Sequence, residues 1–204
     1  MKAAITIFFL MLLCTGRADS QDTRVTEYKK AMPGKKAIKK IYTTMRFPES
    51  MVGQGAGGIV VLNVKVLKDG TVDDIQVERS TNQEYLNCVS QFFITIKEKW
   101  NPAISDGMAV ESQSKVVFMF FREPLRNEQS FDLAKKAFKN KNYEEAMKHV
   151  NQAISQEPYN HELYRLRSEI SAGMGNAAGL MADSNMARDL DEKIAVIFHT
   201  TSVY

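Results

Sequence analysis

The chain has 204 residues, 44% of them hydrophobic, and a formal net charge of +3. This length and composition allow one or two small cores. A change of pattern near Pro124, from alternating strands to helix alone, favours two. Only two cysteines are present, Cys14 and Cys88. If Cys14 is removed with a cleaved amino-terminal signal, Cys88 remains alone and an internal disulfide is excluded.

Residues 1–20 have the pattern of a secretory signal peptide. Lys2 supplies the positive charge, Ala4–Leu13 forms the apolar run, and small residues suited to signal peptidase follow. A run of ten residues is too short to span a bilayer comfortably, so cleavage and a periplasmic location are expected. A retained inner-membrane anchor is the alternative. Cys14 is interpreted as part of the apolar run, because Leu13 stands where lipoprotein processing needs a small side chain.

Residues 21–46 are interpreted as a basic linker with eight lysines and arginines against Asp22 and Glu27, a local charge of +6. Two interpretations stay open. Lys29–Lys40 could rest on an anionic envelope surface of lipid or glycan, or the segment is a solvated linker. In the second case it contains one short helical piece with Ile38, Ile41, Tyr42 and Met45. Nucleic acid is not expected as a partner outside the cytoplasm.

Residues 47–124 predict an α+β domain with the order ββαβ. Ile59–Leu67 alternates and is rich in β-branched residues, Asp69-Gly70 supplies a hairpin turn, and Val72–Val77 continues as the second strand. A helix is expected to begin after Thr81 or Asn82. Its apolar stripe, with spacings of three and four, contains Leu86, Val89, Phe93, Ile96 and Trp100.

The third strand, Val110–Phe121, follows a stop at Pro102 and a turn at Gly107. A right-handed crossover gives an antiparallel three-stranded sheet in the order second, first, third. The third strand then lies at an edge, although Val116–Phe121 is apolar on both faces. Two interpretations stay open: self-pairing or cover by the second domain, and addition of a partner's extended peptide.

The same segment resembles the TonB carboxy-terminal domain family. The matching residues are Phe47-Pro48, Gly57-Gly58 before Ile59-Val60-Val61, Asp69-Gly70, Val77, Trp100-Asn101-Pro102-Ala103, Gly107 and Val117-Phe118-Met119-Phe120. Proteins of this family couple an energised inner-membrane complex to outer-membrane receptors, whose short amino-terminal box pairs with the edge strand of the domain. The resemblance implies a TonB-dependent outer-membrane receptor as a candidate partner, with Phe47 and Pro48 flanking the docked peptide. The implied edge consists of Lys115, Val116, Val117, Phe118, Met119, Phe120 and Phe121.

The segment before this domain departs from the family pattern. An energy transducer needs a retained anchor and a long, usually proline-rich spacer, whereas residues 21–46 contain a single proline, Pro33. A membrane-anchored energy-coupling component is therefore kept as an alternative, and peptide binding is the main expectation.

Residues 125–194 resemble one or two tetratricopeptide repeats, giving an α-helical hairpin domain. Two helices, Phe131–Phe138 and Tyr143–Val150, are separated by polar residues. The residues expected to pack the hairpin are Leu133, Ala134, Ala137, Tyr143, Ala146, Val150, Ala153 and Pro158. A degenerate second repeat follows, and because free-standing solenoids usually need three, these helices are expected to dock on the first domain or on a partner. Residues 195–204 are interpreted as a tail, and the apolar run Ile194–Phe198 would seal that contact.

No pattern suited to catalysis is found, so no enzyme activity and no cofactor are expected. Gly53–Gly58 precedes a strand and lacks the lysine of a phosphate loop. His149, His161 and His199 lack metal-ligand spacing. The sequence thus predicts a non-enzymatic periplasmic interaction protein that binds an extended peptide by strand addition at residues 115–121, with the helices holding a second partner. Besides the energy-coupling alternative, a scaffold for envelope assembly stays open. The oligomeric state is not predicted.

Overall fold

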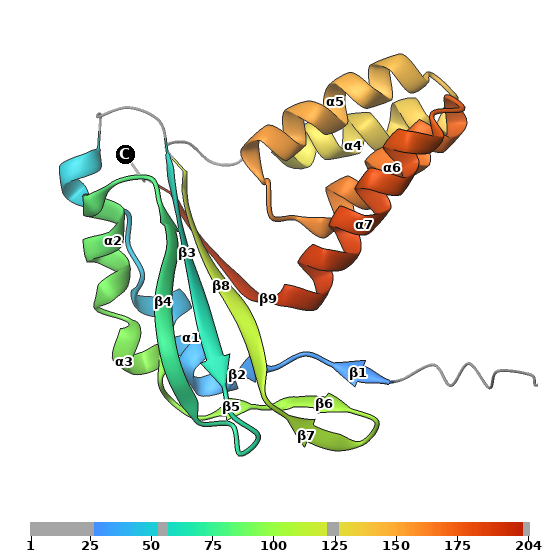
Figure 1. The fold of residues 1–204 in the computed structure, drawn as a ribbon. Helices are drawn as coiled ribbons and strands as arrows, with labels where there is room; N and C mark the ends of the chain where they lie inside the picture. Colours follow the sequence, from blue (N-terminus) through green and yellow to red (C-terminus); the bar gives the residue numbers. More distant parts are fainter. Residues whose placement is uncertain (1–26, 53–56, 122–126, 202–204) are drawn as a thin grey trace, which may run out of the picture.

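The computed structural model describes residues 27–52, 57–121 and 127–201 (Figure 1). The amino-terminal part contains β1 (Tyr28–Lys29), β2 (Met32–Pro33), α1 (Lys35–Thr44), a 3-10 turn (Glu49–Met51), β3 (Gly58–Val66), β4 (Val72–Ser80), α2 (Gln83–Ser90), α3 (Phe93–Ile96), β5 (Trp100–Asn101), β6 (Ala103–Ser105), β7 (Met108–Val110) and β8 (Ser112–Phe121). The remainder contains α4 (Asn127–Lys139), α5 (Tyr143–Gln156), α6 (His161–Gly173), α7 (Ala177–Lys193) and β9 (Ile194–Thr201).

The main sheet has four strands in the order β4-β3-β8-β9. β3 pairs antiparallel with β4 and β8, as the predicted order of second, first and third strands requires. The prediction of a three-stranded sheet was wrong by one strand, because β9 adds a fourth strand parallel to β8. β9 follows α7 directly, with no turn residues between them, and it lies in residues that were interpreted as a tail. It was therefore not predicted as a strand.

Side chains of the central strands alternate between two cores on opposite faces of the sheet. Val60, Leu62 and Phe118 point into a core covered by α1, α2 and α3. Val61 and Val117 point to the other face, where they pack with residues of α6 and α7. Figure 1 shows the two groups of helices on opposite sides of the sheet.

The amino-terminal segment is not a solvated linker in the structure. Ala31, Ile41 and Met45 are buried in the first core, and β2 pairs with β5 beside the buried Trp100. An apolar stripe on an otherwise basic helix is sufficient to bury one face of α1. The first domain therefore includes at least residues 27–46, which the sequence analysis placed outside it.

The predicted single helix is broken into α2 and α3, and Trp100 lies in β5. Its backbone N–H donates to the carbonyl of Gly70 at 2.9 Å, and its indole Nε1 donates to the carbonyl of Ile96 at 2.7 Å. The bond to Gly70, which is distant in the sequence, takes the Trp100 N–H away from a continued helix. The predicted stripe still faces the sheet, because all five of its residues belong to the first core or pack against it.

The helical unit, α4–α7, contains two antiparallel hairpins. Asn142, Asn160 and Asn176 cap α5, α6 and α7, each side chain accepting a backbone N–H in the first turn of its helix. Small residues let α4 and α5 approach closely; the buried centre contains Ala134, Ala146, Val150, Ala153, Leu163, Leu166 and Ile170. The helices are thus confirmed, whereas their tetratricopeptide assignment stays a prediction.

Candidate protein-binding edge

The seven residues predicted to bind a peptide lie together on β8, with both sides of the strand paired. Val116 to Phe120 are each at most 1% exposed, while Lys115 and Phe121 are half-buried. On one side β8 pairs with β3 from Gly58↔Phe120 to Val66↔Ser112. On the other side it pairs with β9 at seven positions, from Lys115↔Ile194 to Phe121↔Thr201. The candidate edge is therefore occupied by the chain's own β9.

Backbone pairing is reinforced by side chains that β9 sends into both cores. Ala195 and Phe198 enter the first core, whereas Ile194 and Ile197 pack on the side of the helical unit. A register shift between Lys115 and Val116 leaves Ala195 as an extra residue in β9. Because both faces of β9 are packed, it is an integral strand of the sheet.

An aromatic cluster surrounds the middle of β9. The ring of Phe198 is fully buried; it stacks on Phe118 at 5.1 Å between centroids and meets Tyr42 edge-on at 4.8 Å. Phe118 in turn stacks on Phe92 at 6.3 Å. Offset and edge-to-face geometries of this kind are favourable beyond the area they bury.

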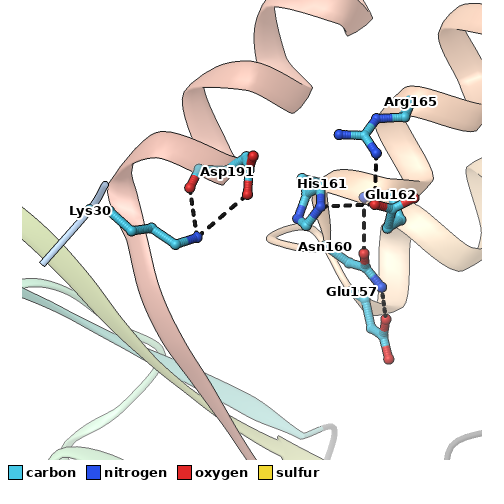
Figure 2. Close-up of polar contacts among 7 residues, drawn as sticks. All are labelled: Lys30, Glu157, Asn160, His161, Glu162, Arg165 and Asp191. Atoms are coloured by element: carbon cyan, nitrogen blue, oxygen red, sulfur yellow. Dashed lines mark hydrogen bonds and ion pairs between the residues drawn. The ribbon is translucent and has the colours of Figure 1, made fainter. Parts of the chain in front are cut away.

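The outer side of β9 is tied down by the amino-terminal segment. The Tyr42 hydroxyl donates to the carbonyl of Ile197 at 2.8 Å. Tyr42 is 52% exposed as a whole, and partial removal from water raises the pKa of Tyr42 above its ordinary value, so this hydroxyl stays a donor at neutral pH. Just before β9, Lys30 Nζ donates to the Asp191 carbonyl at 2.8 Å and lies 3.4 Å from its carboxylate (Figure 2). These contacts link α1 to β9, and the segment before α1 to the last turn of α7.

The predicted flanking residues lie near the carboxyl end of β8. The ring of Phe47 is 6.3 Å from Phe120 and 5.9 Å from Tyr85, and Pro48 is half-buried. At the same end of the sheet, a pocket of about 310 Å³ opens between the sheet and α5. Its lining includes Gly57 to Ile59, Met119 to Phe121, Ser155 and Gln156.

The opposite edge of the sheet, β4, has no strand on its outer side among the described residues. Its pairing with β3 shifts register twice, between Val61 and Leu62 and between Lys65 and Val66. Charged side chains line it, and one of them, Glu78, forms a 2.6 Å ion pair with Lys115 of β8. Bulges and charges are the usual protection of an edge against strand addition. β4 is therefore a poor docking edge.

The residues predicted to pack the helical hairpin are mostly brought together. Ala134, Ala146, Val150 and Ala153 are buried, with Ala137 and Tyr143 packed against them. The carbonyl of Pro158 accepts a hydrogen bond from the Tyr164 hydroxyl at 3.0 Å. The exception is Leu133.

Leu133 is 38% exposed and lies outside that core. It lines an open pocket of about 270 Å³ between α4 and α5, together with Lys136, Glu145 and His149. Its side chain therefore faces solvent, not the hairpin interior.

Polar contacts in the helical unit hold helices together. At the start of α6, Asn160 accepts from the backbone N–H of Glu162 at 3.1 Å and donates to Glu157 at 2.8 Å, while Arg165 pairs with Glu162 at 2.9 Å (Figure 2). Between helices, the Arg167 guanidinium donates twice to Asp183, at 2.8 and 2.7 Å. Each of these contacts has a structural role.

Groups suited to chemistry are not assembled in the part of the chain that the structure describes. No cluster of three histidines, cysteines or carboxylates that could hold a metal ion occurs there. Burial raises the pKa of the Cys88 thiol, which favours its protonated, unreactive form. No helix among these residues has the length and apolar character needed to cross a bilayer. The signal-peptide prediction for residues 1–20 lies outside them.

Three features were not predicted: β9 as a strand, the contact of Tyr42 with β9, and the contact of Lys30 with Asp191 of α7. Ile194–Phe198 was recognised as apolar, and its three β-branched residues are the signal that indicates a strand. The hydroxyl contact of Tyr42 had no comparable signal, because it depends on how α1 packs.

Comparison with known proteins supports the resemblance for the sheet domain. Residues 43–121 match the family model described as Gram-negative bacterial TonB protein C-terminal. The match covers less than half of the chain and ends with β8, so it includes neither the helical unit nor β9. No curated protein matches the sequence. Residues 43–121 are therefore similar to the TonB carboxy-terminal family, whose domains interact with proteins such as outer-membrane receptors.

Proposed function

We propose that this protein is a non-enzymatic interaction module of the periplasm that binds an extended protein segment on β8 and a second partner on its helical unit. An amino-terminal segment of a TonB-dependent outer-membrane receptor is the candidate ligand for β8. The proposal combines the family match with one structural observation, which is the pairing of β8 with β9.

That pairing supports the proposal because it demonstrates that this side of β8 accepts a strand. β8 is paired with β9 at seven positions, and the cluster of Phe118 and Tyr42 receives an aromatic side chain from β9. A partner segment would use the same backbone groups and the same aromatic site. It must therefore take the place of β9 and not add beside it.

Replacement of β9 has a cost that the partner must offset. Burial of a phenylalanine side chain such as Phe198 is worth about 1.5–3 kcal/mol, and each ladder hydrogen bond about 0.5–1.5 kcal/mol. A partner can bind only those molecules in which β9 has left β8. The apparent affinity for the partner is therefore the intrinsic affinity multiplied by the fraction of such molecules. The intact protein should consequently bind such segments weakly, and weakening β9 should strengthen binding.

The test is a titration of the chain from Gln21 to Tyr204 with fluorescent peptides from the amino-terminal segments of outer-membrane receptors of the same bacterium. Val196→Ala trims a half-buried side chain of β9 that packs against the first core, and Phe198→Ala removes the fully buried ring of β9. We expect affinity to rise in that order among folded variants, and Leu133→Ala, on the exposed face of α4, to leave it unchanged. Equal affinity of wild type and both β9 variants would rule out strand replacement.

A scaffold for envelope assembly is the second candidate, and the complete burial of Phe198 favours it. In that case β9 closes β8 permanently and only the helical unit meets a partner. Amide hydrogen exchange at Val116–Phe120 distinguishes the two functions. Slow exchange without any peptide binding would support the scaffold, whereas peptide-dependent changes at these amides would support strand replacement.

The periplasmic location is tested separately, by cell fractionation and intact mass. A mature chain that begins near Gln21 in the soluble periplasmic fraction supports the proposal. Retention of residues 1–20 in the inner membrane would instead support the energy-coupling alternative.

A further inference from the structure

Lysines from two separate segments form a single positively charged face on the first domain, named here the lysine face. They are Lys35, Lys36, Lys39 and Lys40 of α1 and Lys97 and Lys99, which follow α3; all six are exposed. The sequence contains no acidic residue from Tyr28 to Pro48. Among the described ion pairs, the one on this face joins Lys40 to Glu98 at 3.8 Å.

Several contacts place the two segments side by side. α1 packs against α3, and Pro33, just before α1, pairs with Trp100. Gly34 lies so close to the backbone carbonyl of Lys99 that an added Cβ would be 2.9 Å from that oxygen. On α1, the buried residues Ala37 and Ile41 define the side that faces the core. Lys35 and Lys39 are spaced to lie on the opposite side, so their charges point outward.

An exposed apolar side chain adjoins the lysine face. Ile94 of α3 is 83% exposed, the highest value among the large apolar residues described as exposed. It precedes Lys97 by three residues, which places both on one side of this short helical segment. A large aliphatic side chain beside a field of lysines is the pattern of surfaces that rest at a membrane interface, where the apolar group enters the headgroup region.

The kind of cation indicates the kind of anion. All six residues are lysines, which are compact, strongly hydrated charges on flexible stems, whereas recognition of one phosphate or carboxylate in fixed geometry favours arginine. A dispersed set of lysines suits a diffuse negative surface, to which each contributes separately. We infer that the lysine face binds the surface of an anionic phospholipid bilayer, with Ile94 inserted at the headgroup level.

This orientation leaves the other parts of the protein accessible. α1 and α3 cover one face of the sheet and the helical unit packs on the other, as Figure 1 shows. A bilayer bound to the lysine face would therefore have the helical unit directed away from it. The inference does not depend on strand replacement at β8.

The test is co-sedimentation of the chain from Gln21 to Tyr204 with vesicles of phosphatidylcholine alone or with about one third phosphatidylglycerol, at low and high salt. We expect binding to the anionic vesicles only, weakened by salt because the charges are exposed. Replacing Lys35, Lys36, Lys39 and Lys40 by glutamine should lower the partition coefficient by about two to three orders of magnitude, since each lysine near the surface contributes about five-fold. Ile94→Ser should lower it several-fold and leave the salt dependence unchanged.

A matched control neutralises the same number of lysines on another part of the protein. Lys136, Lys139, Lys141 and Lys148 are exposed residues of the helical unit, and their replacement by glutamine should leave vesicle binding within about two-fold of wild type. Circular dichroism establishes that each variant is folded. Equal loss in both sets of variants, or binding to purified peptidoglycan and not to vesicles, would overturn the inference. An Ile94→Ser variant that binds as wild type would overturn the insertion of α3.

Discussion

Phe118 of β8 and Phe198 of β9 stack with their ring centroids 5.1 Å apart, although the whole of α4–α7 lies between them in the sequence. The side of β8 that the sequence analysis assigned to a partner peptide is thus filled by the same chain. The helical unit is consequently an excursion from one sheet, which leaves it after β8 and returns to it as β9. The two parts of the protein share a strand and are coupled through it.

Phe198→Ala should lower the free energy of unfolding by about 3–5 kcal/mol, because it empties a fully buried aromatic site. The effect should include faster amide exchange at Val116–Phe120, since β9 protects that side of β8. Urea unfolding followed by the fluorescence of Trp100, the single tryptophan, measures the first quantity. Met181→Ala, on the exposed side of α7, is the control and should change stability by less than about 0.5 kcal/mol. A change for Phe198→Ala as small as that of the control would contradict the role of β9.

Gly70 and Gly107 both have positive φ, but a side chain added at Gly70 would clash with its surroundings and one added at Gly107 would not. Gly70 has φ of 84° and Gly107 has φ of 78°. An added Cβ at Gly70 would lie 2.2 Å from the carbonyl oxygen of Trp100, whereas at Gly107 no atom lies within 4 Å. Gly107→Ala should cost about 1–2 kcal/mol from conformation alone. Gly70→Ala should lower the free energy of unfolding clearly more, because the clash adds to the strain. Thermal unfolding of the two variants measures the difference, and an equal fall in their midpoints would contradict the prediction.

The bidentate pair of Arg167 and Asp183 ties α6 to α7, with the Asp183 side chain 10% exposed. Asp183→Asn should destabilise the helical unit by about 2–3 kcal/mol, because it leaves a largely buried guanidinium without its countercharge. The same reasoning predicts that Arg167→Met in the Asp183→Asn background recovers part of the loss. Denaturation of Asp183→Asn, of Arg167→Met alone and of the double variant measures the coupling, and additive effects would exclude a direct interaction.

Acidification should loosen β9 through His199, whose ring meets the Phe121 ring at 5.6 Å. Burial lowers the pKa of His199 below its ordinary value, with the charge of Glu157 opposing this shift. The unfolded chain therefore takes up the proton more readily, so His199 lowers stability as the pH falls below about 6.5, the ordinary pKa of histidine.

The control for this pH effect is His199→Phe, which keeps an aromatic ring beside Phe121 and removes the titration. Between pH 7.5 and 5.5, we expect the thermal midpoint of the wild type to fall more than that of the variant. Equal pH dependence in the two proteins would show that other groups dominate. No large effect is expected, because the His199 side chain is partly in contact with solvent.

Local sequence patterns predicted those helices, strands and turns whose structure depends mainly on their own residues. The alternation of β3, the turn at Asp69-Gly70 and the spacing of alanines in α4 and α5 are of this kind, and the order β4-β3-β8 followed from crossover handedness. The resemblance carried by the motif residues between Phe47 and Phe120 is confirmed by the match at residues 43–121.

Features fixed by tertiary contact were not predictable in the same way. Trp100 leaves the helical pattern because its backbone finds a hydrogen-bond partner in the Gly70 turn. The apolar stripe of α1 was expected in a short helical piece, but the basic composition of residues 21–46 gave no sign that this stripe is buried against the sheet. The pairing of β9 with β8 joins segments far apart in the chain, and no local pattern specifies which apolar strand meets which edge. The position of β8 along the chain was thus predicted, but its place at an edge was not found, because β9 pairs with its second side and makes it an inner strand.

The parallel pairing of β8 and β9 also sets an order of events for a chain made from its amino terminus. β8 is complete before α4–α7 are synthesised, and its second side stays unpaired until residues 194–201 have followed them. An apolar strand with an open side is prone to wrong pairing, and contacts distant in sequence form slowly. Arrival of β9 therefore completes this sheet, and the time before it arrives is the period in which β8 is exposed to aggregation.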